Sequence, residues 1–392
     1  MDRNKFLLVF TLILCMINSA FSQVKVIPLS SAKEINGYGV YYALPKTVLN
    51  IEVQVLKTQN IKGPYSDYAK KYLGLNKVIK TNSNKYEITN VIIKPSYIPD
   101  ADQYYYVEID EKASKETKSV LMSLTESGLI MGVNDKLFKR KINKSDKKYI
   151  SGNFDYNSVF NYYLSPDVVE HIDTVFTRVD VDTSTIEKQI FNTVLINKTS
   201  EDKAKEIADE IMRIKESRYK LLTGFQEVSY DKGAIEYMDS QLKKISDDDL
   251  KLFTGVKLEK KFTYHYTYIP NSDIKDELIT PLFKFSESSG VHDLSSSIGE
   301  KVNIKVINMK TTDKFNNVIK KNYDTKKEKR SKGFYYRIPD YGNVSIIYNK
   351  EEYFKSDFLI NQFGIVTFLP ANKSEIKFYP NTGSIKNVVI EK

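Results

Sequence analysis

Residues 48–56 read VLNIEVQVL, and this stretch decides the class of fold. Apolar and polar residues alternate through most of it, and many of the apolar ones are β-branched, which is typical of a strand with one buried face. Similar patterns recur at four places further along the chain: 86–94, 104–109, 119–133 and 173–182. Most of the chain from 35 to 195 is therefore expected to be strand, and 119–133 to be a hairpin that turns at Gly128.

Two features interrupt these strands. Residues 63–74 (GPYSDYAKKYLG) begin with a proline and end with a glycine, which predicts a short helix whose aromatic face seals the edge of a sheet. The prolines and acidic residues of 95–102 are expected to join the strands on either side of them.

The segment 199–254 has a different period. Thr199 and the acidic residues after it form a good helix start, and apolar residues then recur at spacings of three and four up to Gly224. A second helical stretch follows from 235, with Ser246 predicted to cap a last turn that ends at Gly255. Two helices with a short connection should lie antiparallel.

Strand patterns return after 256, so the fold class is predicted to be α+β, with two β-rich, sandwich- or barrel-like domains joined by an antiparallel helical hairpin. The predicted divisions are a signal peptide (1–22), an N-terminal β-rich domain with one short helix (23–197), the helical hairpin (198–255) and a C-terminal β-rich domain (256–392). GVYYALP (39–45) and GFYYRIP (333–339) match in form. They fit either a duplicated domain or independent use of proline as a strand terminator.

The N-terminus has the pattern of a cleavable export signal. Arg3 and Lys5 precede an apolar run over 6–16, and small residues lead to a predicted cut after Ser22. A lipid anchor on Cys15 is disfavoured, because the bulky Leu14 precedes it. Cys15 is the only cysteine, so the mature chain would hold no disulfide and no thiolate metal site.

The chain is accordingly expected in the periplasm or associated with the outer membrane. No second apolar stretch approaches the roughly 20 residues of a membrane-spanning helix, so no transmembrane span is predicted.

The net charge of +9 is concentrated in two places, 136–148 and 320–332. No nucleic-acid partner is predicted, because the chain is expected to be exported. An anionic envelope surface is the functional interpretation, and solvated loops are the simpler one. The contacts to such a surface would be Lys139, Arg140, Lys141, Lys327, Lys329 and Arg330.

The sequence offers no catalytic constellation. His171, His265 and His292 stand far from one another, and neither a phosphate-binding loop nor a nucleophile elbow is present. The Asp180-x-Asp182-x-Ser184 pattern lacks the glycine and the closing glutamate of a calcium loop. No catalytic residue, cofactor or metal is therefore predicted, and whether the chain is an enzyme stays open, with a non-enzymatic role favoured.

One aromatic row is a candidate ligand platform. It comprises alternate residues of a predicted strand, which share one face: Phe262, Tyr264, Tyr266 and Tyr268. A row of this kind stacks on a sugar or a peptide, or packs on the protein's own core, and the absence of tryptophan favours packing.

Several segments resemble an uncharacterised exported family of Bacteroidota known as domain of unknown function 4831. They are GVYYALPKTVLNIEV (39–53), GPYSDYAKKYLGL (63–75), KAKEIADEIMRIKESRYKLLTG (203–224), LFTG (252–255), YYRIP (335–339) and the QFG-to-LP ending (362–370). The resemblance covers nearly the whole mature chain and implies export and the order β-region, helix pair, β-region. It implies no activity and no catalytic residues.

These observations predict a non-enzymatic periplasmic binding or scaffold protein that contacts envelope proteins through sheet edges or the helix pair. The alternative is a glycan-binding or glycan-hydrolysing protein that uses paired carboxylates and tyrosine platforms. A binder of anionic surfaces through the two lysine-rich stretches is a third possibility.

Overall fold

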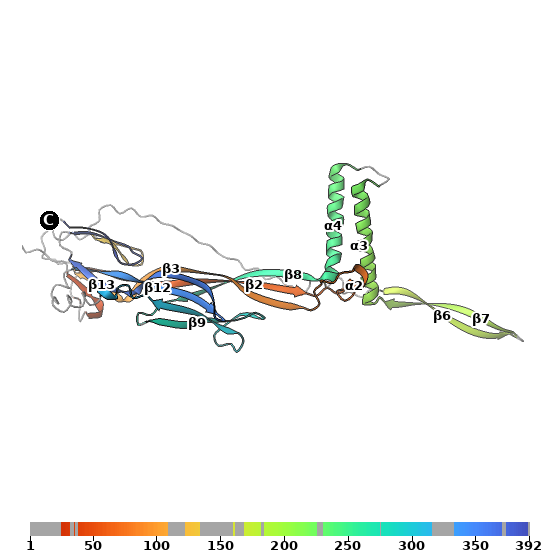
Figure 1. Ribbon diagram of the computed structural model, residues 1–392, viewed down its shortest axis with the longest axis horizontal. Helices are drawn as coiled ribbons and strands as arrows, with labels where there is room; N and C mark the ends of the chain where they lie inside the picture. Colours follow the sequence, from red (N-terminus) through yellow and green to blue (C-terminus); the bar gives the residue numbers. More distant parts are fainter. Residues whose placement is uncertain are drawn as a thin grey trace, which may run out of the picture.

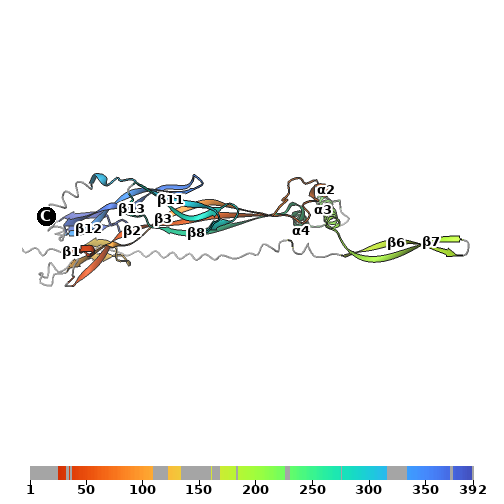
Figure 2. The same cartoon turned by 90° about the horizontal axis from the view of Figure 1, so that it is seen from below.

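The computed structural model describes residues 25–31, 35, 38, 39–108, 122–133, 160, 168–181, 184–225, 230–274, 276–315, 333–370 and 374–390. The predicted signal peptide and both lysine-rich stretches (136–148 and 320–332) lie outside these residues. The described chain is β-rich and forms several antiparallel sheets. In Figures 1 and 2 the molecule is elongated, and a pair of helices projects sideways from its long axis.

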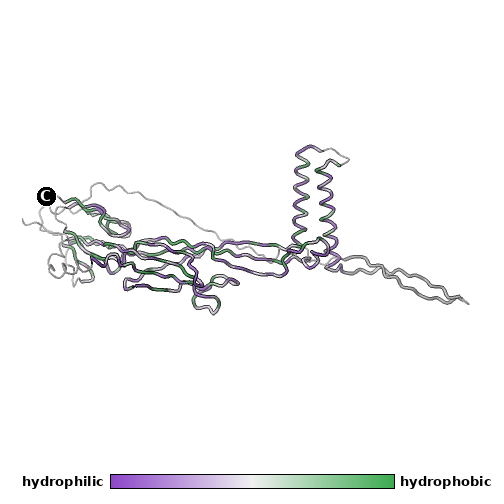
Figure 3. Tube along the Cα trace, viewed as in Figure 1, coloured by the Kyte–Doolittle hydropathy of each residue, from purple (hydrophilic) through white to green (hydrophobic). Residues whose placement is uncertain are grey.

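The first sheet has four strands in the order β1-β3-β2-β8. Its centre is a long antiparallel pair, whose register runs from Gly39 opposite Glu108 to Asn60 opposite Ser83. Apolar and polar residues alternate along these strands (Figure 3), so one face can be buried and the other solvated. The strand bounds are β1 (Lys25–Pro28), β2 (Gly39–Ile61), β3 (Ser83–Glu108) and β8 (Val256–Tyr268); a 3-10 turn (Leu29–Ser31) follows β1.

Residues 86–94 and 104–109 were predicted to be two strands joined by a turn, and this is wrong: β3 runs through both as one strand. Pro95 lies opposite Leu49 and Pro99 opposite Pro45, so both prolines pair with β2. The partner of β3 on its other side, β1, pairs only with residues 105–108. Proline is tolerated where a strand is unpaired on one side, because its missing N–H is not needed there.

The second sheet has five strands in the order β10-β9-β11-β12-β13. It packs on the first sheet, and the main core combines apolar residues from both, including Ile51 and Val53 of β2 with Phe283 of β9 and Ile346 of β12. The strand bounds are β9 (Glu277–Ser286), β10 (Gly290–His292), β11 (Glu300–Asn308), β12 (Gly333–Tyr348) and β13 (Glu351–Pro370).

A third sheet, in the order β15-β14-β5-β4, combines strands from distant parts of the sequence. The predicted hairpin at 119–133 is confirmed for its described residues, where β4 pairs with β5 and Gly128 turns with a positive φ of 85°. The bounds are β4 (Met122–Leu124), β5 (Ile130–Val133), β14 (Ser374–Phe378) and β15 (Ile385–Ile390).

This pairing corrects the predicted division into an N-terminal and a C-terminal β-rich domain. β8 comes from the C-terminal segment but pairs with β2 over its whole length, from Leu49 opposite Tyr268 to Ile61 opposite Val256. Two residues of β14, Ile376 and Lys377, pair with Val133 and Gly132 of β5. Strands that precede and strands that follow the helices in the sequence share sheets, so the helices do not join two separate domains.

The two long helices are α3 (Ser200–Thr223) and α4 (Lys232–Thr254), which lie side by side. The predicted start of α3 is right: Thr199 accepts a hydrogen bond from the Asp202 N–H, and the Asp202 carboxylate accepts one from the Thr199 N–H. Gly224 ends α3 with a φ of 76°, where glycine has no steric penalty. α4 is continuous through Ser246, so the predicted internal cap is wrong.

The short helix predicted at 63–74 is present as α2 (Ala69–Leu73), preceded by turns and ended by Gly74. Its apolar face does not seal a sheet edge as predicted. Tyr65 and Ala69 instead pack against Ala204, Ala208 and Phe253, at the base of the helix pair.

The remaining strands, β6 (Val168–Val181) and β7 (Ser184–Asn197), form a separate two-stranded ribbon. It extends beyond the helix pair at the end of the molecule opposite the C-terminal strands (Figure 1). No described helix is long and apolar enough to cross a membrane.

Candidate functional site

The aromatic row of β8 packs on the protein itself. Tyr264, Tyr266 and Tyr268 are partly buried against the main core. The Tyr266 ring stacks on Phe283, with ring centroids 4.7 Å apart and an interplanar angle of 9°. Burial raises the pKa of Tyr266 to about 12. Phe262, further along the row, has the Lys260 ammonium 5.1 Å from its ring centroid. These contacts account for the row without a ligand.

The other predicted contacts lie outside the described residues: Lys139, Arg140, Lys141, Lys327, Lys329 and Arg330. Of the three histidines, His265 lies on the solvent face of the β8 sheet, opposite Glu52 in the register. Among the described residues no three His, Cys, Asp or Glu side chains come together as a metal site would require.

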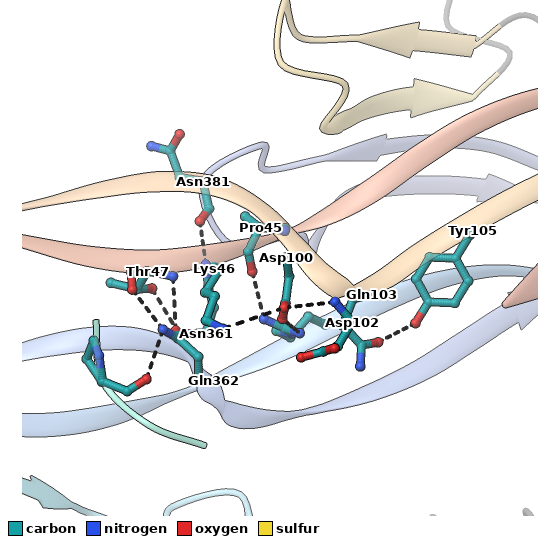
Figure 4. A network of polar contacts seen from close by, with 12 residues as sticks. Pro45, Lys46, Thr47, Asp100, Asp102, Gln103, Tyr105, Asn361, Gln362 and Asn381 are labelled. Carbon is teal, nitrogen blue, oxygen red and sulfur yellow. Dashed lines mark hydrogen bonds and ion pairs between the residues drawn. The ribbon is translucent and has the colours of Figure 1, made fainter. Parts of the chain in front are cut away.

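A buried polar network, not anticipated from the sequence, lies where β2, β3, β12 and β13 meet (Figure 4). Arg337 donates to the Pro45 carbonyl at 2.7 Å and to the Asp100 carboxylate at 3.0 Å. The side chains of Arg337 and Asp100 are only 4% and 8% exposed. The Lys46 ammonium lies 3.9 Å from the other oxygen of Asp100, which makes it a second, more distant partner. Asp100 and Arg337 are nevertheless each other's main charged partner, and a buried charge without a partner is very costly.

The same network ties β2 to β13 through Thr47. Its hydroxyl accepts a hydrogen bond from the Asn361 N–H at 3.0 Å, and the Gln362 side chain bonds both the N–H and the carbonyl of Thr47. The Asn361 amide in turn donates to the Asn381 carbonyl. We call these residues the polar clasp: Pro45, Lys46, Thr47, Asp100, Arg337, Asn361, Gln362 and Asn381.

The two similar segments GVYYALP (39–45) and GFYYRIP (333–339) contact each other beside the polar clasp. The Tyr42 hydroxyl of the first accepts a hydrogen bond from the Tyr335 N–H of the second at 2.8 Å, and Pro45 receives the Arg337 side chain. Both segments end at this crossing and build it together. Pro45, Arg337 and Gln362 each lie in a segment quoted in the sequence analysis (39–53, 335–339 and 362–370). No pattern in these segments predicts that they contact one another in the fold. The clasp fastens distant parts of the chain, and we assign it a structural role.

The base of the helix pair holds a buried carboxylate. Asp249 is 7% exposed, and its Oδ2 atom has no hydrogen-bond partner among the described atoms. Burial raises the pKa of Asp249 to about 6, and the charges of Glu210 and Asp248 act in the same direction. The carboxylate therefore weakens the base of the pair at neutral pH.

The outer half of the helix pair carries a groove, and this is the strongest candidate for a functional site. The groove has a volume of about 330 Å³ and lies between α3 and α4. Its lining is mainly apolar and aromatic: Ser217, Leu221, Tyr230, Tyr237, Met238, Gln241 and Leu242. We call it the tip groove.

Large side chains around the tip groove are exposed. Tyr237 is 67% exposed and Tyr230 42% exposed, whereas Leu221 is buried at the bottom. Near the turn between the helices, Leu222 is 62% and Phe225 75% exposed. At the base of the pair α2 covers the helices, but no described element covers the outer half.

The groove is held in shape by an ion pair between the helices. Arg218 of α3 donates two hydrogen bonds to Asp239 of α4, at 2.8 and 3.1 Å. The hydrogen bond from Arg218 holds the pKa of Asp239 below its usual value. A bidentate pair of this kind fixes one helix against the other at the level of the groove.

The fold and the site define a β-rich protein of several antiparallel sheets, from which a helix pair with an exposed apolar groove projects. Residues 38–386 match the family model described as Domain of unknown function (DUF4831), so the chain belongs to this family. The match begins at the start of β2 and reaches β15, so it includes the polar clasp and the tip groove. No curated protein and no solved structure matches the chain.

Proposed function

We propose that this chain is an exported, non-enzymatic scaffold protein of the cell envelope that holds a partner protein in the tip groove. The observation that carries the proposal is the groove itself, an apolar concavity with exposed tyrosines on a projecting element. Export is proposed from the N-terminal signal pattern, together with the family resemblance described above.

The composition of the groove favours a protein partner. Tyrosine and methionine are enriched at protein interfaces, where tyrosine offers a large apolar ring with a polar end and methionine adapts its shape. Tyr230, Tyr237 and Met238 supply both kinds of contact. Arg218 and Asp239, each next in sequence to a groove residue, pair with each other, and the lining itself carries no charged side chain. An apolar contact is therefore the main attraction that the groove offers.

The shape of the groove favours an amphipathic helix as the bound segment. Tyr230 lies just before α4, and the rest of the lining follows α3 from Ser217 to Leu221 and α4 from Tyr237 to Leu242. An amphipathic helix places side chains three and four residues apart into such a groove. The bound helix would complete a three-helix contact in the outer half of the pair, as α2 does at the base.

A photo-crosslinking residue at position 237, with a second at position 219 as the matched control, tests the proposal. Tyr219 and Tyr237 are both tyrosines with similar exposure, 63% and 67%. Tyr219 is two residues from both Ser217 and Leu221, which is a rotation of roughly 200° around α3. Tyr219 therefore lies on the face of α3 opposite the groove. Crosslinking in living cells should join a specific envelope protein to position 237 and not to position 219.

The captured protein is then purified and its affinity measured directly. Tyr237→Ser should weaken binding by about tenfold or more, as loss of an interface tyrosine often does, and Tyr219→Ser should leave it unchanged. The crosslinked peptide should map to an amphipathic helix in the partner. Equal crosslinking at both positions, or equal affinity of both variants, would contradict the proposal.

A further inference from the structure

Among the described strands, the β6–β7 ribbon is paired with no other strand at either edge. Its register is regular from Val168 opposite Asn197 to Val181 opposite Ser184, and no third strand of the described chain joins it. A two-stranded ribbon alone in water is marginally stable, and its free edges are templates for a further strand. The ribbon also extends away from the other described elements (Figures 1 and 2), so none of them covers its edges.

We infer that the free edge of β6 pairs with the β6 edge of a second copy of this chain, which makes a four-stranded antiparallel sheet across a two-fold axis. A second copy is the occupant that symmetry offers most simply, because one edge then serves both partners. The inference does not depend on the tip groove, since it concerns a different element.

Symmetry restricts which positions can face each other. A two-fold axis through an antiparallel pair must lie perpendicular to the sheet, and it keeps each residue on its own face. Directly opposite residues share a face, and faces alternate along a strand. Even-numbered positions of β6 can therefore face only even-numbered positions of the second β6, and odd only odd.

This restriction means that two β7 edges related by a two-fold axis cannot pair opposite charges. The only charged positions of β7 are 187 (Glu) and 188 (Lys), which differ in parity and cannot face each other across a two-fold axis. On β6, positions 170 (Glu) and 178 (Arg) are both even and can do so. Opposite charges at paired positions stabilise a sheet, which favours the β6 edge.

The charges also select one register. Two symmetric registers give the longest overlap of β6 with itself: 168–180 centred on position 174, and 169–181 centred on position 175. The first places position 170 (Glu) opposite 178 (Arg). The second places 170 (Glu) opposite 180 (Asp), which is repulsive. The register centred on position 174 is therefore assigned.

A disulfide scan tests the register. The chain's only cysteine is Cys15, so a Cys15→Ser background has no thiol. Thr174→Cys brings the two introduced residues together at the axis, with a Cα separation of about 4.5–5.5 Å that a disulfide can span. Mild oxidation of the full chain should give a covalent dimer. Thr177→Cys is the matched control, because its two copies lie about 20 Å apart and should stay monomeric.

A charge reversal tests the pairing without a disulfide. Position 178 (Arg) faces position 187 (Glu) within the ribbon, so the dimer contains the ladder 187–178–170. Glu170→Arg should weaken dimerisation by about tenfold, measured by sedimentation equilibrium at low salt. The triple variant E170R/R178E/E187R reverses every charge in the ladder and should restore the wild-type dissociation constant.

The outcomes are distinct. A dimer with Thr174→Cys, none with Thr177→Cys and rescue by the triple variant support the inference. A monomer at all concentrations would overturn it, and efficient crosslinking through Val175→Cys instead of Thr174→Cys would overturn the assigned register. Tyr237→Ser should leave dimerisation unchanged, so failure here is separable from failure of the proposed function.

Discussion

Tyrosine serves two opposite purposes in the polar clasp region and in the tip groove. At the strand crossing, Tyr42 is 1%, Tyr105 3% and Tyr335 7% exposed, and the Tyr105 ring stacks on both of the others. At the helix tip, Tyr219 and Tyr237 are more than 60% exposed. The chain has 28 tyrosines and no tryptophan, so composition alone cannot separate these roles.

This difference in exposure indicates where a partner protein can bind. At the crossing the polar end of Tyr42 is bonded within the protein, so the ring contributes to stability and is closed to a partner. At the tip the rings have no cover among the described residues and remain available. Variants in the crossing should therefore change stability, and variants at the tip should change binding.

The largest effect is expected from breaking the buried ion pair of the polar clasp. Arg337→Met leaves the Asp100 carboxylate buried without its main partner, and stability should fall by about 3–5 kcal/mol. Urea denaturation followed by circular dichroism measures it. The double variant R337M/D100N should recover much of the loss, because no buried charge remains. A single variant as stable as the wild type would show that the pair does not hold the crossing.

The next effect concerns the tyrosine that links the two YY segments. Tyr42→Phe removes two buried hydrogen bonds of the Tyr42 hydroxyl, one accepted from the Tyr335 N–H at 2.8 Å and one donated to the Tyr335 carbonyl at 3.4 Å. The expected loss is about 1–3 kcal/mol in the free energy of unfolding. Tyr41→Phe is the control at the neighbouring position, since Tyr41 is 50% exposed, and it should have little effect. Equal losses in both variants would contradict a specific role for the Tyr42 hydroxyl.

A gain in stability is expected at the base of the helix pair. The pKa of Asp249 is raised from 3.8 to about 6, so folding favours the protonated carboxyl. The contribution of Asp249 to the free energy of unfolding is therefore most favourable below about pH 4, falls as pH rises from about 4 to 6 and is then constant. At pH 7, Asp249→Asn should stabilise the chain by about 1–2 kcal/mol and remove this pH dependence.

Asp247→Asn is the control for Asp249. The Asp247 side chain is 52% exposed and pairs with Lys243, and its charge is not one of those that raise the pKa of Asp249, so its removal should give no stabilisation. Thermal unfolding between pH 4 and 8 distinguishes the two variants. If the stability of Asp249→Asn still falls between pH 4 and 6, another titrating group causes the pH dependence.

The smallest effect on stability is expected at the tip. Tyr237→Ser and Tyr219→Ser should each change the free energy of unfolding by less than about 0.5 kcal/mol, as exposed substitutions usually do. The same two variants should differ in partner binding, as proposed above. A large loss of stability in Tyr237→Ser would mean that Tyr237 stabilises the fold, as the buried Tyr42, Tyr105 and Tyr335 do.

The sequence by itself determined the local elements, because their causes are local. Alternation predicted the strand at 48–56, and Thr199, Gly224 and Gly255 marked the helix ends through capping and backbone geometry. The candidate site was only partly predictable: the helix pair was named as a possible contact element, but Tyr230 and Tyr237 were not singled out. Their exposure depends on what packs against each helix face.

Only the tertiary structure decided which strands pair and which tyrosines are buried. Thr47 and Asn361 bond across 314 residues of sequence, and β8 joins β2 across the whole helix pair. The period of a strand fixes which residues share a face, but not which strand lies beside it or what covers that face. That choice is made by the burial of apolar area and the pairing of buried charges between distant segments, and neither leaves a local pattern in the chain.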